Sequence, residues 1–424
     1  MSSSVTVTPL AEFSRLQLAR LCRELMLAAQ FNSRTGYAAL RINHGDAAYK
    51  DTAIQNWMGA SPVYTRRMQQ TLGFAGGADV STIFKGLQLD VGFTHQYFDV
   101  HFEVHSAQEG RFWLRSCGAL LEAEPRGEEA VKVMCHDIED PTFDATAMAT
   151  NPRARMRPVH RPPRAPVDRE PHCEWRVFID EQAEPLVEPP IAETMAATRL
   201  GQLPIQKPAQ DGAGGLTAYH GQVQEQLHLE CFSHSALLAI YSELAVQIHL
   251  LINALLLVVT ETYGAEAAQA VAEFQMCGTS WVVSERLKAL LAQDIDDADG
   301  IQMMMAVLAL HPAFKPDNYI NCSVEVTGQR SARLTLGDCQ AAREALPCTW
   351  YALLARGIDS GLQALVQGVN RCATISPVAN TALCWDIEIT DTDQVQEEPF
   401  AVQVAKGTVL YQTQLDDHIQ VLQL

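Results

Sequence analysis

The chain has 424 residues, a formal net charge of -19 at pH 7 and a pI near 5.1. Its length favours two or three domains, and its 47% content of hydrophobic residues is enough to build buried cores. The acidic balance opposes binding to a phosphate backbone, and no run of Lys and Arg is interleaved with aromatic residues. We therefore do not expect nucleic acid to be a partner.

The sequence also argues against export and membrane insertion. Residues 1–17 lack the basic region and the apolar region of a secretory signal. The longest apolar stretch, 250–259, contains Asn253 and is shorter than the roughly 20 residues that a membrane span needs. The eleven cysteines include no CxxC pair, which argues against a disulfide framework. We expect a cytoplasmic protein with reduced thiols and no membrane partner.

The first half of the chain begins with a predicted helix and continues with predicted strands. Apolar residues at helical spacing predict a helix over 10–29. The alternation in DVHFEVH predicts a strand over 99–105, and RFWLRS predicts its hairpin partner over 111–116. The segment HCEWRVFI, residues 172–179, predicts a strand that closes this half.

The second half repeats this order after a segment rich in Pro and Gly, 185–215, which predicts an extended linker. An almost wholly apolar segment predicts a buried helix over 235–263 that ends at Gly264, followed by a helix over 265–274. NCSVEVTGQRSARLTLGDC then predicts a hairpin, and LCWDIEI predicts a closing strand. We therefore expect a first module over 1–184 and a second module over 216–424.

The repeat can be counted. Glu103 and Cys117 are fourteen positions apart, as are Glu325 and Cys339. Three cysteines in each half follow in the same order, Cys117, Cys135 and Cys173 in the first, and Cys339, Cys348 and Cys384 in the second. The sequence predicts an α+β fold made of two diverged copies of a helices-plus-antiparallel-sheet module. The alternative is chance similarity between hairpins in a chain that contains many cysteines.

Familiar catalytic motifs are absent from the sequence. It contains no GxxxxGK[ST], no GxGxxG after a strand, no GxSxG and no HExxH, which argues against common nucleotide enzymes, serine hydrolases of the α/β type and zincins. The first predicted strand instead carries His101, Glu103 and His105 at alternate positions, so that one face presents all three. These residues are candidate ligands for Zn, Mn or Fe. The alternative is a strand face that is polar because it meets solvent.

A second candidate site lies in the segment MCHDIEDPTFDATA. A thiol beside imidazole and carboxylate groups can become a thiolate nucleophile, which makes Cys135, His136 and Asp137 candidate catalytic residues, with Asp137 as proton acceptor. The alternative is the start of a helix, where acidic residues favour the positive end of the helix dipole.

Arginines are concentrated in the next segment, NPRARMRPVHRPPR. Arg157 and Arg161 are candidate substrate-binding residues, because guanidinium groups bind carboxylates in a bidentate manner. The alternative is that the segment pairs with the acidic surface of its own domain or of a partner. The second half has Ser323 and Thr327 where the first has His101 and His105, so we assign the chemistry to the first half.

The order of a strand, a cysteine, about eighteen residues, a C-x-D motif, a long loop and a closing strand with a cysteine resembles the L-2-amino-thiazoline-4-carboxylic acid hydrolase family. The resemblance rests on Cys117, on Cys135 with Asp137, and on Cys173, and it covers about residues 99–180 and, more faintly, 321–390. It implies hydrolytic attack on a carbon that bears nitrogen and sulfur. The chain departs from that single-module family by its duplication, its HxExH strand face and its arginine-rich loop.

Together these features predict a metal- or cysteine-dependent hydrolase or lyase whose substrate is a small anionic molecule containing nitrogen or sulfur. The first half is expected to be catalytic, and the second half structural or responsible for forming a homo-oligomer. One alternative is a non-haem iron oxygenase that uses His101, His105 and one carboxylate. Another is a small-molecule-binding sensor module whose cysteines hold a structural zinc ion.

Overall fold

The fold is that of a computed structural model, which describes residues 10–210, 214–292, 295, 300–379, 381, 383–390 and 397–412. Part of the expectation about a secretory signal concerns residues 1–9, which lie outside this range. All eleven cysteines are free.

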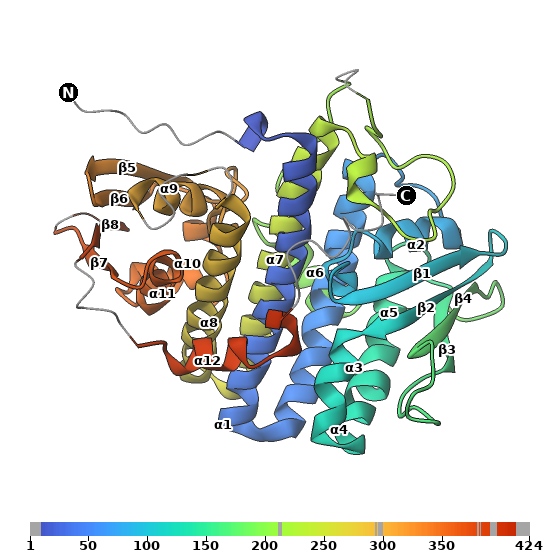
Figure 1. The fold of residues 1–424 in the computed structure, drawn as a ribbon. Helices are drawn as coiled ribbons and strands as arrows, with labels where there is room; N and C mark the ends of the chain where they lie inside the picture. The colour runs from blue at the N-terminus through green and yellow to red at the C-terminus, as the bar shows by residue number, and fades with distance from the viewer. Residues whose placement is uncertain are drawn as a thin grey trace.

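The first module starts with helices and continues with a four-stranded sheet (Figure 1). Its N-terminal elements are η1 (Leu10–Glu12), α1 (Arg15–Thr71), α2 (Val80–Leu87), η2 (Val91–Phe93), β1 (Phe98–Val104) and β2 (Glu109–Cys117). They are followed by α3 (Gly118–Ala123), η3 (Glu124–Arg126), α4 (Glu128–Lys132), the π-helical segment η4 (Val133–Ile138), α5 (Glu139–Met148), β3 (Ala154–His160), β4 (Cys173–Ile179) and α6 (Pro190–Ala197).

The second module has the same order of helices and strands. Its elements are η5 (Leu229–Cys231), α7 (His234–Tyr263), α8 (Ala265–Leu291), α9 (Ile301–Leu310), η6 (Pro312–Phe314), β5 (Cys322–Gly328), β6 (Ser331–Leu336), η7 (Ala341–Arg343), α10 (Trp350–Ala355), α11 (Ser360–Val369), β7 (Ala373–Pro377), β8 (Cys384–Ile389), α12 (Phe400–Lys406) and η9 (Val409–Gln412). Figure 1 shows the two sheets on opposite sides of the central helices.

The two sheets have the same topology. Their strand orders are β1-β2-β4-β3 and β5-β6-β8-β7, with antiparallel neighbours. Corresponding residues face each other in both sheets: Glu103 and Arg111 match Glu325 and Arg333, and Phe112 and Trp175 match Leu334 and Trp385. The expected α+β fold with two diverged copies of one module is confirmed.

The long helix α1 is a helical hairpin that corresponds to α7 and α8. It breaks at Gly45, which has φ 84° and ψ 179°, and Gly264 joins α7 to α8 with φ 88° and ψ 172°. These positive φ values favour glycine, which has no Cβ. Ser14 and Ser233 cap the first helices of the two hairpins. Ser14 and Ser233 are 219 positions apart, and so are Gly45 and Gly264.

Two buried ion pairs join the modules reciprocally. Glu24 pairs with Arg286, with Nε and Oε2 2.6 Å apart, and Glu243 pairs with Arg67, with Nη2 and Oε1 2.8 Å apart. Glu24 and Glu243 are 219 residues apart, as are Arg67 and Arg286. The glutamate of each module thus pairs with the arginine of the other, and such reciprocal contacts are typical of a twofold-symmetric dimer. The modules therefore pack like two subunits joined in one chain.

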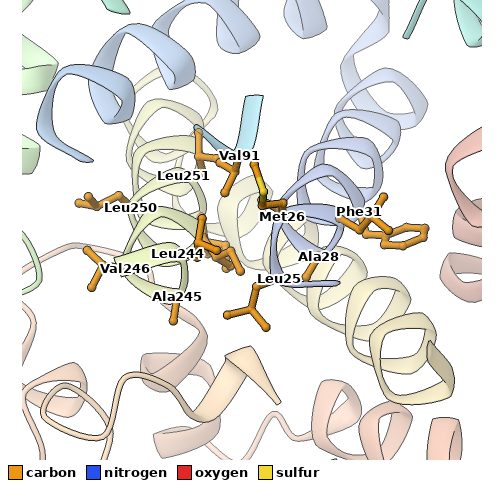
Figure 2. Close-up of a cluster of buried hydrophobic side chains, with 14 of the residues drawn as sticks. Leu25, Met26, Ala28, Phe31, Val91, Leu244, Ala245, Val246, Leu250 and Leu251 are labelled. Atoms are coloured by element: carbon orange, nitrogen blue, oxygen red, sulfur yellow. The ribbon is translucent and has the colours of Figure 1, made fainter. Parts of the chain in front are cut away.

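The main core lies between α1 and α7 (Figure 2). Leu25 and Leu244, which are counterparts in the two modules, both belong to it and are 1% exposed. Within the described residues, α7 is the one helix long and apolar enough to cross a membrane, and the structure buries it in this core.

Several elements differ from the sequence expectations. The first helix runs on to the break at Gly45, a second helix continues from there to Thr71, and the helix after Gly264 continues to Leu291, because buried positions recur well beyond residues 29 and 274. The segment 185–215 is not extended throughout: it contains α6, whose Ala192 and Met195 are fully buried. Cys117 is the last residue of β2, whereas Cys339 lies three residues beyond the end of β6.

Candidate functional site

The two histidines that were expected to share a metal have different surroundings. His101 is buried, its ring stacks on Trp113, and its two nitrogens lie 3.0 Å from Asp99 Oδ1 and 2.8 Å from Glu225 Oε1. Both imidazole nitrogens therefore have protein partners. Glu225 comes from the segment between α6 and α7, which covers this side of β1 and hydrogen-bonds to the amide of Phe102.

His105 lies just beyond β1, where its Nε2 is 3.6 Å from Glu103 Oε2. Glu103 is held mainly by Arg111, and both histidine and glutamate are exposed. In the part of the chain that the structure describes, no three His, Cys, Asp or Glu side chains are arranged to hold a metal ion. The geometry gives no support to His101, Glu103 and His105 as one metal site.

Cys117, Cys135 and Cys173 lie close to one another and to Glu139. Burial is the largest influence on Cys135, Cys117 and Cys173, and it raises the pKa of each thiol, with a further increase from the Glu139 carboxyl. Cys135 is therefore a neutral thiol, which is a weak nucleophile. A thiolate mechanism would need a change that the structure does not provide.

The neighbours of Cys135 point away from a shared site. His136 Nε2 lies 2.7 Å from the carbonyl oxygen of Pro162, and Asp137 lies on the surface, 3.4 Å from Lys50 Nζ. The π-helical segment η4 rotates successive side chains by less than an α-helix does. This segment brings Cys135 and Glu139 inward, and π-helical turns are frequent at functional sites.

The arginine-rich segment pairs with carboxylates of its own module. Arg157 Nη1 lies 2.9 Å from Asp144 Oδ1, and Arg161 forms an ion pair with Asp140. Arg161 also lies over the ring of Trp175, with 5.9 Å between its Cζ atom and the ring centroid. The pairing agrees with the alternative reading of this segment. Arg161 nevertheless remains close enough to Glu139 to affect its ionisation.

A cavity between the α1 hairpin and the segment η4–α5 is lined by polar groups that were not among the candidate residues predicted from the sequence. The centre of a water-sized molecule can occupy about 100 Å³ of it, which is room for several waters or one small ligand. We call it the inner cavity. Its polar and aromatic lining includes Arg34, Tyr49, Trp57, Tyr64, Asp90 and Glu139.

Glu139 is the most perturbed acid of the inner cavity. Burial raises the pKa of Glu139 to about 8, against the opposing influence of Arg161 and with a smaller increase from Asp140. Among the described residues, no side chain donates a hydrogen bond to its carboxyl group. The group is therefore largely protonated at pH 7 and can donate its proton to a ligand.

Asp90 is a buried carboxyl group that lines the same cavity, and unlike Glu139 it is hydrogen-bonded. Its Oδ1 accepts from Tyr64 Oη at 2.8 Å and from the amide of Gly92 at 2.6 Å. Burial raises the pKa of Asp90 to about 6, because these hydrogen bonds offset part of the desolvation. At pH 7 Asp90 is mostly ionised and Glu139 mostly protonated, and two carboxyl groups that differ in this way can share acid and base roles.

Arg34 supplies the positive charge of the inner cavity. Its Nε lies 2.8 Å from Glu122 Oε2, and its Nη2 donates to Tyr97 Oη at 3.4 Å. The pKa of Arg34 is raised by Tyr97, Glu122 and Tyr49, which outweigh desolvation. The guanidinium therefore stays charged beside the cavity.

The second module has lost this lining. The counterparts 219 residues further along are apolar or neutral: Arg34 corresponds to Asn253, Tyr37 to Leu256, Tyr49 to Ala268, Trp57 to Met276 and Tyr64 to Val283. The difference between the two linings can be seen in the sequence only when Gly45 is aligned with Gly264. The repeat counted from Glu103 to Cys117 begins after α1, so it does not reveal this difference.

No family model, no curated protein and no solved structure matches the chain.

Proposed function

We propose that the protein is a hydrolase or lyase that acts on a small anionic molecule containing nitrogen or sulfur, bound in the inner cavity of the first module. The observation that carries the proposal is Glu139, a carboxyl group with a pKa of about 8 that faces a cavity beside Arg34. Perturbed carboxyl groups in concave, partly apolar pockets are typical of acid–base catalysis.

In the proposed reaction, Asp90 accepts a proton from water while the water oxygen attacks a carbon bonded to nitrogen or sulfur. Protonated Glu139 donates its proton to the departing nitrogen or sulfur as the bond to carbon breaks. The proton on Asp90 then returns to Glu139 through solvent, so the two groups recover their starting states. Arg34 contributes a positive charge that favours an anionic substrate.

The resemblance to the L-2-amino-thiazoline-4-carboxylic acid hydrolase family supports this reaction class. It rests on Cys117, on Cys135 with Asp137, and on Cys173, and in this chain those thiols are near Glu139. The geometry favours Glu139 over a Cys135 thiolate because burial keeps the thiol neutral. The oxygenase alternative receives less support because His101 and His105 have different partners. The zinc-sensor alternative receives less support because, among the described residues, no three cysteine, histidine or acidic side chains are grouped to hold a metal ion.

The test is a comparison of variants against small cyclic carboxylates with C–N and C–S bonds, including L-2-amino-thiazoline-4-carboxylic acid. Substrate consumption is followed by proton NMR. We expect turnover by the wild type and at least a 100-fold loss in Glu139→Gln and in Asp90→Asn. The exposed Glu325→Gln serves as the control and should keep the wild-type rate.

The pH profile gives a second readout of the same proposal. The rate should fall as the pH rises through about 8, because Glu139 loses the proton that it donates. It should also fall as the pH drops through about 6, because Asp90 becomes protonated and no longer accepts one. Full activity in Glu139→Gln, or no consumption of any compound, would contradict the proposal.

A further inference from the structure

A second cavity adjoins the inner cavity on the side of Arg34. The two share Arg34, Tyr37, Tyr49 and Met134 in their linings, so they lie directly beside each other. We call the second one the outer cavity. Glu139 lines only the inner cavity, whereas Arg41 and Arg126 line only the outer one.

The outer cavity is positively charged in a strongly acidic protein. Its lining contains three arginines, Arg34, Arg41 and Arg126, and a single carboxylate, Glu122. That carboxylate is already paired with Arg34, at 2.8 Å. The charges of Arg41 and Arg126 therefore have no acidic counterpart in the lining itself.

Arg41 is held in a fixed orientation. Its Cζ lies 3.7 Å from the centroid of the Tyr49 ring, so the guanidinium is stacked on an aromatic surface that both cavities share. Its ion pair with Asp46, at 3.1 Å, is weak because the Asp46 side chain is 87% exposed. The ion pair with Asp46 uses Nε, so the two Nη groups of the stacked guanidinium remain to contact an oxyanion.

The second module forms one wall of the outer cavity. Val404, Gly407, Thr408 and Val409 belong to α12, η9 and the turn between them, and they lie opposite the arginines of α1 and η3. The amide of Leu410 donates to Glu122 Oε1 at 3.3 Å and fixes this wall. The reciprocal contact exists in the other half, where Leu200 donates to Glu344. The first module's site is therefore completed by the second module.

We infer that the outer cavity binds the anionic group of the ligand, a carboxylate or a phosphate, between Arg41 and Arg126, while the body of the same ligand occupies the inner cavity. This inference rests on the proposed function and adds to it the position of the anion and the role of the second module. The ligand is then a small organic anion with a flat apolar body, because aromatic side chains line the inner part.

Two further observations agree with an anion at this place. Desolvation, followed by the charges of Arg126 and Arg34, lowers the pKa of Arg41, although Tyr49 and Asp46 oppose the decrease. A bound anion would relieve this repulsion. In the second module the counterparts of Arg34 and Arg41 are Asn253 and Thr260, so this half of the chain has lost the charged groups together with the aromatic lining.

The experiment is calorimetric titration of the full chain with benzoate, which joins a carboxylate to a flat apolar body, and with inorganic phosphate. We expect saturable benzoate binding to the wild type that is at least tenfold weaker in Arg41→Gln and in Arg126→Gln. Phosphate should compete with benzoate. Arg333→Gln removes an exposed ion pair on β6 with Asp386 and should bind benzoate like the wild type.

The outcomes separate the two proposals. Equal benzoate affinity in the arginine variants and the wild type, or no binding of either anion, would overturn the inference. Phosphate that binds without competing with benzoate would also overturn it, because the two anions would then occupy different sites. If benzoate binds as expected and Glu139→Gln retains turnover, the anion site stands and the proposed catalytic role of Glu139 fails.

Discussion

The two helical hairpins of this protein share their caps, turns and interface residues but differ in the residues that line the inner cavity of the first module. Both begin at a serine cap, turn at a glycine after thirty residues and contribute one arginine and one glutamate to the reciprocal ion pairs. In the first hairpin, the side chains that line the inner cavity include Arg34 and several tyrosines, and their counterparts in the second hairpin are mostly apolar. The residues that hold the modules together are retained in both copies, whereas the residues that line a cavity are retained in one.

This difference explains why a module without the cavity lining remains in the chain. The ion pairs need both copies, since each one joins a glutamate of one module to an arginine of the other. The wall of the outer cavity also comes from the second module. The second module therefore supplies the ion pairs and a wall of the outer cavity, although it lacks the residues that line the inner cavity of the first module.

The largest expected effect is the loss of one partner from a reciprocal ion pair. Arg67→Met leaves Glu243 buried without its cation, and Arg286→Met does the same to Glu24, so each should lower the free energy of unfolding by about 3–5 kcal/mol. Burial already raises the pKa of Glu243 despite Arg67, which indicates that the pair does not fully offset its desolvation. The double variant Arg67→Met with Glu243→Leu should therefore recover most of the loss. Urea denaturation of the four proteins measures this.

An unequal loss in Arg67→Met and Arg286→Met, by more than about 2 kcal/mol, would mean that the modules do not share the interface symmetrically. The same inequality would weaken the comparison with a twofold dimer.

The next effect concerns Glu139 and depends on pH. Burial raises the pKa of Glu139 from 4.5 to about 8, so the folded protein keeps a proton that the unfolded chain releases between these pH values. The folded state therefore loses stability as the pH rises through this window. Glu139→Gln cannot ionise and should exceed the wild type by roughly 2–4 kcal/mol at pH 9, with little difference at pH 4.

Thermal unfolding at both pH values, with Glu325→Gln as the exposed control, measures this effect. A difference between Glu139→Gln and the wild type that is the same at pH 4 and pH 9 would show that the carboxyl group titrates normally, and the acid role proposed for it would then lose its basis.

The sequence predicted the sheets better than the cavity, for a physical reason. Alternation at 99–105 and 111–116 and the repeated spacing from Glu103 to Cys117 follow from local backbone geometry, and the structure has both hairpins. The lengths of α1 and α8 were underestimated because these helices contain many polar residues that become buried only by packing against another helix.

The candidate residues were harder to predict, because their environments depend on distant segments. His101 meets Glu225 from beyond β4, and Glu139 meets Arg161 from beyond β3. Nothing in the neighbourhood of either residue in the sequence indicates these contacts. The prediction that the chemistry lies in the first half remains a prediction, now supported by the cavity lining.

A smaller effect is expected at the helix caps that begin the two hairpins. Ser14 is exposed, and its hydroxyl accepts from the amide of Gln17, while Ser233 is fully buried and accepts from the amide of Ala236. Serine caps contribute about 1 kcal/mol, and a buried orphan amide costs more than one that water can reach. Ser233→Ala should therefore destabilise the protein more than Ser14→Ala in the same denaturation assay. The reverse order would contradict the assigned burial of this cap.

The smallest effect is expected at His105, and it separates the acid–base proposal from a metal-dependent one. The side chain is 45% exposed and its closest charged partner is Glu103, at 3.6 Å, so His105→Ala should change the free energy of unfolding by less than about 0.5 kcal/mol. If Glu139 is the acid, this variant should also keep the wild-type rate, and Ser323→Ala, at the position in β5 that corresponds to His101, should do the same.

A metal held by His101, Glu103 and His105 would instead require both bound metal and turnover to disappear together in His105→Ala. Elemental analysis of the two purified variants beside the wild type, combined with the NMR assay, measures both quantities. Loss of a stoichiometric metal with loss of turnover in His105→Ala alone would move the chemistry from the inner cavity to the face of β1, because no other change in the variant could remove both.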